Sequence, residues 1–112
     1  MSLDDEQRAL LAAVVDRMIP PADFPHVSHG DAAARLEDRL DSEKLARWLQ
    51  GLANESITVY STGFLDMHEG TRDEVLDRIE SENTRTDWQM NPTPFFGQMI
   101  DTLAEYLRET GA

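Results

Sequence analysis

Residues 10–21 read Leu-Leu-Ala-Ala-Val-Val-Asp-Arg-Met-Ile-Pro-Pro, with apolar side chains recurring every three to four positions. This period places the apolar side chains on one face of an α-helix and leaves Asp16 and Arg17 off that face. We expect Asp4 to cap the start of the helix, because its carboxylate can accept a hydrogen bond from a free backbone N–H. Pro20 and Pro21 predict its end, since neither has an N–H to donate. The chain therefore opens with an amphipathic helix.

Two more helices are expected after a loop at residues 20–30, which contains three prolines and a glycine. Asp31 is predicted to cap a short helix that runs to Leu40. Ser42 is predicted to cap a long helix whose apolar face continues to Tyr60. β-Branched residues precede Tyr60 and favour a strand locally, but the helical spacing continues through them. We therefore expect this segment to be helical.

The last two helices are predicted from their start signals. Thr71 and Glu74 form the spacing of a capping box, which indicates the start of a fourth helix. Thr93 followed by Pro94 combines a capping hydroxyl with the residue favoured at the first helical position. Gly111 follows the apolar face of this fifth helix and is typical of a helix end.

Length and pattern together predict the architecture. A folded chain of 112 residues exposes about 6,200 Å² of surface, which suits one hydrophobic core. We find no repeat and no convincing alternating strand, so the prediction is an all-α fold. Residues 1–112 should form a single domain of about five helices, packed as a compact orthogonal or bundle-like unit. The expected core includes Leu11, Val15, Met18, Leu49, Leu52, Leu76, Ile79, Met99 and Leu103.

Composition excludes several classes of function. The chain has 10 Lys and Arg against 22 Asp and Glu, and its net charge of -12 repels nucleic acid and anionic membranes. No apolar run approaches the roughly 18 residues that a membrane span needs, so we expect no direct membrane insertion. The absence of cysteine excludes disulfides, thiolate zinc sites and cysteine nucleophiles. An acidic, lysine-poor composition is also typical of salt-adapted proteins.

The residues offer little for catalysis or metal binding. His26 and His29 lie three positions apart beside Asp23 and Asp31, and with His68 they could supply imidazole and carboxylate ligands to a metal. Histidines beside prolines more often lie at the surface or cap helices, which is the interpretation we favour. The sequence has no glycine-rich phosphate loop, nucleophile elbow or calcium loop. We therefore predict no catalytic, cofactor-binding or metal site.

Large apolar residues in polar surroundings are the candidates for partner binding, because Trp, Met and Phe are favoured in interface centres. Trp48 lies on the apolar face of the third helix and is expected in the core. Trp88 lies in a polar loop, which either folds back over the core or presents the ring to a partner. Gly51 costs about 1 kcal/mol relative to Ala inside a helix, which predicts that another element packs closely there. The candidate partner-binding residues are Phe24, Trp88, Met90 and Phe95.

The order of these features resembles a known family. The opening helix reads Glu6-Gln7-Arg8-Ala9-Leu10-Leu11 and ends in Asp16-Arg17-Met18-Ile19-Pro20. Gly51-Leu52-Ala53 follows in the long helix, and Phe95-Phe96 begins the last one. Together these features resemble the gluconate 2-dehydrogenase subunit 3 family, the small subunits of flavin-dependent sugar and sugar-acid dehydrogenases.

The resemblance implies a non-catalytic accessory subunit without a cofactor of its own. Its implied partner is a large FAD-dependent subunit of the glucose-methanol-choline oxidoreductase type, often with a cytochrome subunit in the same complex. The implied role is assembly or export, commonly through a twin-arginine signal that this chain lacks. A periplasmic location is implied if a signal has been removed, and a cytoplasmic one otherwise. Two alternatives stay open: a stand-alone acidic interaction or salt-adapted domain, and a small metal protein built on His and carboxylate ligands.

Overall fold

A computed structural model describes residues 3–20 and 22–111 of the chain. These residues form five α-helices and one short 3₁₀ turn, and no strand occurs among them. The predicted all-α class is confirmed. The elements are α1 (Asp5–Met18), α2 (His29–Arg39), α3 (Ser42–Tyr60), η1 (Phe64–Asp66), α4 (Glu69–Glu80) and α5 (Pro92–Glu109).

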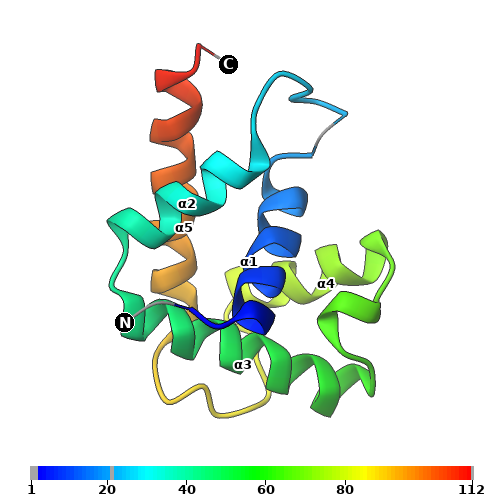
Figure 1. Cartoon of the computed structure of the whole chain (residues 1–112). Coiled ribbons are helices and arrows are strands. Elements are labelled where there is room, and N and C mark those ends of the chain that lie inside the picture. Colours follow the sequence, from blue (N-terminus) through cyan, green and yellow to red (C-terminus); the bar gives the residue numbers. More distant parts are fainter. Residues whose placement is uncertain (1–2, 21, 112) are drawn as a thin grey trace.

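The helices cross at steep angles around one core (Figure 1). α3 runs across the base of the view, α1 stands near the centre, and α2 crosses in front of α5. α1 packs against α2, α3 and α4, whereas α5 packs against α2 and α4. The protein exposes 6208 Å² of surface, which agrees with the area expected for a single compact unit of this mass.

Helix caps agree with the sequence prediction at α1 and differ by a few residues elsewhere. Asp4 caps α1 through a complete capping box, in which its carboxylate accepts from the Gln7 amide at 2.7 Å. The predicted cap at Asp31 is wrong, since Ser28 caps α2 and its hydroxyl accepts from the Asp31 amide at 3.2 Å. The predicted cap at Ser42 is also wrong, since Asp41 caps α3 and its side chain accepts from the Lys44 amide at 3.1 Å. The observed cap lies three residues before the predicted one in α2 and one residue before it in α3.

The two later helices begin before their predicted start signals. His68 caps α4, with Nδ1 accepting from the Gly70 amide at 3.1 Å, so the predicted Thr71 capping box is wrong. α5 starts at Pro92, and Thr93 instead donates its hydroxyl to the Ile79 carbonyl oxygen at 2.6 Å. That tertiary bond joins the start of α5 to the end of α4. Pro20 follows α1 as predicted, while Pro21 lies outside the described residues.

The predicted core is confirmed with one exception. Eight of the nine expected residues are buried, whereas Met18 is half-buried at the end of α1. Trp48 is fully buried, stacks on Phe96 with ring centroids 5.5 Å apart, and donates its indole N–H to the Pro92 carbonyl at 3.1 Å. The β-branched segment before Tyr60 is helical, as its spacing predicted.

Candidate partner-binding surface

A buried carboxylate holds the loop between α4 and α5 in place. Glu55 is 2% exposed, and its oxygens accept hydrogen bonds from the backbone amides of Arg85 (2.9 Å) and Thr86 (3.0 Å). They also accept from the Thr86 hydroxyl at 2.6 Å and the Trp88 indole N–H at 3.2 Å. Burial alone would raise the pKa of Glu55, but these hydrogen bonds outweigh it and hold the pKa below its ordinary value. The loop is thus tied to α3 by an ionised side chain.

Sequence analysis did not single out Glu55, although a signal was present. Glu55 lies three positions after Leu52 and seven after Trp48, both of which are buried. These spacings place it on the apolar face of α3. A carboxylate on such a face requires partners, because burying an unpaired charge is costly.

The same loop explains Gly51. A Cβ at this position would lie 2.4 Å from Cε3 of Trp88, a distance at which real Cβ atoms are essentially never found. The close packing predicted at Gly51 is therefore confirmed, and the packing element is the indole of Trp88. Trp88 is 4% exposed and meets Trp48 edge-on, with ring centroids 5.7 Å apart and an interplanar angle of 61°. The loop folds back over the core, which is the first of the two interpretations of Trp88.

The four candidate partner-binding residues do not gather on one surface. Trp88 and Phe95 are 4% and 3% exposed, so their rings offer little area to another chain. Phe24 and Met90 are half-buried against the core. The loops that carry Phe24 and Met90 lie at opposite ends of the molecule (Figure 1). An interface made with their help needs additional apolar surface.

The three histidines have different surroundings. The ring Nε2 of His29 contacts the Ile19 carbonyl oxygen, and His68 caps α4 while its Nε2 lies 3.0 Å from the Thr71 hydroxyl. His26 is exposed in the loop before α2. Within residues 3–20 and 22–111, no group of three or more histidines and carboxylates is placed to hold a metal ion.

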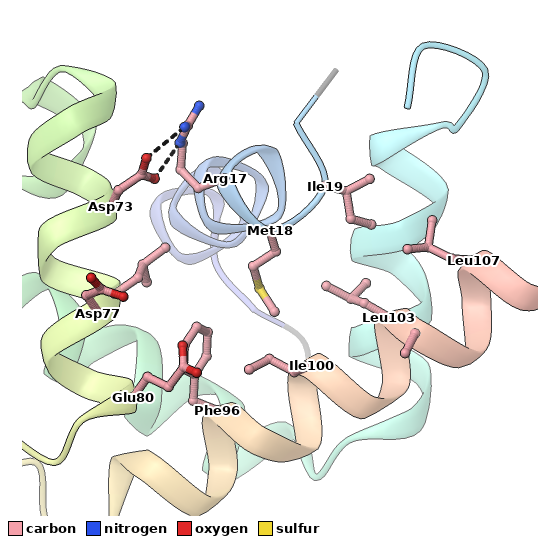
Figure 2. A pocket seen from close by; sticks show the side chains of 12 residues that line it. Arg17, Met18, Ile19, Asp73, Asp77, Glu80, Phe96, Ile100, Leu103 and Leu107 are labelled. Carbon is pink, nitrogen blue, oxygen red and sulfur yellow. Dashed lines mark hydrogen bonds and ion pairs between the residues drawn. The ribbon is translucent and has the colours of Figure 1, made fainter. Parts of the chain in front are cut away.

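An open groove lies where α1, α4 and α5 converge, with a volume of about 540 Å³. We call it the α1–α4–α5 groove. Figure 2 shows Met18 and Ile100 extending into it from α1 and α5, while Asp77 and Glu80 lie along its α4 side. The groove is lined by Arg17, Met18, Ile19, Asp73, Leu76, Asp77, Glu80, Phe96, Ile100, Leu103, Ala104 and Leu107.

A bidentate ion pair closes one end of the groove. Arg17 Nε and Nη2 donate to the two carboxylate oxygens of Asp73 at 2.7 and 2.8 Å (Figure 2). Arg17 Nη1 also lies 3.2 Å from Glu69 Oε2. Hydrogen bonding to Asp73 raises the pKa of Arg17, and the same bond lowers the pKa of Asp73. Sequence analysis missed this pair, because 56 residues separate its members.

The model of the family described as Gluconate 2-dehydrogenase subunit 3 matches residues 5–107. Neither a curated protein nor a solved structure matches the chain significantly. Among the helices described, none combines the length and apolar character that crossing a membrane requires.

Proposed function

Because this chain belongs to the gluconate 2-dehydrogenase subunit 3 family, we propose that it is a non-catalytic accessory subunit of a dehydrogenase complex. The family match extends over all or most of every helix and is the observation that carries the proposal. In this proposal a large FAD-dependent subunit of the glucose-methanol-choline type oxidises a sugar or sugar acid. The small chain supports assembly or export of that subunit, and a cytochrome subunit in the same complex accepts the electrons.

The chemistry of the α1–α4–α5 groove supports this division of roles. A sugar acid is an anion and needs a free cation or several polar donors to hold it. Arg17 supplies positive charge to the groove lining, but Asp73 and Glu69 already neutralise it. The other charged groups of the lining are the carboxylates of Asp77 and Glu80, which repel an anionic substrate. We therefore assign substrate and flavin to the large subunit.

Co-expression tests the proposal directly. The chain is produced with an affinity tag, alone and together with the flavoprotein dehydrogenase encoded beside its gene. We expect a stable complex in which the flavin absorbance follows the large subunit, and dehydrogenase activity that the isolated small chain lacks. We also expect the yield of folded large subunit to fall when the small chain is omitted.

Two results would contradict the proposal. The first is failure of the purified chains to associate at any concentration tested. The second is oxidation of a sugar or sugar acid by the small chain alone. An unrelated acidic helical protein with the same tag is the control for non-specific capture.

A further inference from the structure

We infer that the α1–α4–α5 groove receives a short amphipathic helix from the large subunit, with an apolar face and lysine or arginine along one edge. The identity of the partner rests on the proposed function. The chemistry of the occupant follows from the side chains that line the groove.

The groove presents apolar surface that the fold leaves uncovered. Ile100 is 38% exposed, although it lies beside Met99 and Leu103, which are buried. Met18 was expected in the core and is instead half-buried, with its side chain extending toward α5 (Figure 2). Leu107 is half-buried farther along α5. Side chains from two helices that face a common open space form the kind of surface in which an apolar helix face binds.

Charge along the groove selects a basic occupant. Asp77 and Glu80 are exposed on α4, and among the described residues neither side chain has an ion-pair partner. At the end of the groove Arg17 is already paired with Asp73. The groove therefore carries uncompensated negative charge beside its apolar surface, within a chain whose net charge is -12. Lysine or arginine at the edge of a partner helix would complement it, whereas an anionic lipid surface would be repelled.

The lining favours a helix over a small polar ligand. Sites for small molecules orient their ligands with a few polar groups that converge on an apolar cavity. In this groove Arg17 and Asp73 bind each other, and the other charged side chains of the lining are the exposed carboxylates of Asp77 and Glu80 on α4. Carboxylates at the edge and aliphatic side chains inside match the helix-in-groove mode of recognition.

Substitutions at the groove test the inference with the large subunit as the binding partner. Ile100→Glu places a carboxylate inside the groove, and Ile57→Glu is its matched control because Ile57 is 55% exposed on α3 and lies outside the lining. Asp77→Lys reverses one groove charge, with Glu74→Lys as the control on the same helix. We expect each groove variant to weaken affinity at least about tenfold. Each control should stay within about twofold.

These variants separate the two proposals. If the wild-type chain binds the large subunit and both groove variants bind as well as their controls, the groove inference is overturned and the proposed function stands. Far-UV circular dichroism and thermal melting of every variant establish that the fold is retained. All four substitutions change exposed residues, so the helices should be preserved.

A peptide experiment tests the groove without the large subunit. The probe is a synthetic amphipathic helix of leucine and lysine, and the control has glutamate in place of lysine. We expect the leucine–lysine peptide to shift the NMR signal of the Met18 methyl group and to leave that of buried Met67 unchanged. The shift should be lost in Ile100→Glu. An unchanged Met18 signal, or equal shifts with both peptides, would overturn the inference.

Discussion

Replacing the buried carboxylate of Glu55 should weaken the protein more than any surface change. In Glu55→Gln the amide oxygen can keep the bonds from Thr86 and Trp88. The new NH₂ group replaces the oxygen that accepts from the Arg85 amide at 2.9 Å, so two donors then face each other. One bond is lost, and the remaining ones change from charge-assisted to neutral. Hydrogen bonds to charged groups contribute about 1.5–3 kcal/mol and neutral ones about 1 kcal/mol. A neutral amide costs less to bury than a carboxylate, which offsets part of this loss, so we expect the free energy of unfolding to fall by about 2–4 kcal/mol.

Urea unfolding followed by tryptophan fluorescence and circular dichroism measures this loss. Glu105→Gln on α5 is the matched control, because Glu105 is exposed and should change stability by less than about 0.5 kcal/mol. A loss below about 1 kcal/mol in Glu55→Gln, close to that of an ordinary exposed site, would refute the proposed role of the carboxylate.

The effect should also depend on pH with a defined sign. The pKa of Glu55 in the folded protein lies below its ordinary value of 4.5, so ionised Glu55 stabilises the folded state. The stability difference between wild type and Glu55→Gln should be fully present above about pH 5 and should shrink as pH falls through the folded pKa. A difference that grows on acidification would contradict this assignment.

Three further predictions concern packing and charge. Gly51→Ala should lower the free energy of unfolding by about 1–3 kcal/mol despite the better helix propensity of alanine, because its Cβ would lie 2.4 Å from Trp88. Gly97→Ala is the control: nothing lies within 4 Å of its Cβ position, so it should stabilise α5 by about 0.5–1 kcal/mol. If both substitutions stabilise, the close contact at Gly51 is wrong. Leu49→Ala should cost about 2–5 kcal/mol in urea unfolding, since Leu49 is fully buried. Added salt should raise the melting temperature by screening the net charge of -12, and a salt-insensitive melt would contradict this.

Much of the fold follows from local spacing in the sequence. The apolar period of α1, together with Asp4 before it and Pro20 after it, predicts that helix close to its observed bounds. In α3 the same period correctly overrides the strand preference of the residues before Tyr60. Gly51 indicated a close approach because glycine is unfavourable inside a helix unless packing requires it. These signals act within a few residues, which is why they can be interpreted without a structure.

The helix caps and the site residues followed less directly from the sequence than the helices did. Ser28 and His68 cap α2 and α4 where Asp31 and Thr71 were expected, because more than one residue near each helix start has a side chain that can accept a bond from a free backbone N–H. Met18 continues the apolar period of α1, yet it is only half-buried against the core and borders the groove. Periodicity shows which face of a helix is apolar but not whether another element covers it.

The sequence by itself determined the helical class, most of the core, the acidic surface and, through its resemblance, the family. The tertiary structure alone decided where Trp88 lies, which groups Glu55 binds, and that α1, α4 and α5 leave an apolar groove with an acidic side. The physical reason is the range of the interactions. Helix periodicity links residues three or four positions apart, whereas Glu55 binds a loop 30 to 33 residues away and Arg17 pairs with Asp73 across 56 residues. Such pairs depend on how the helices are arranged around the core, which local periodicity does not specify.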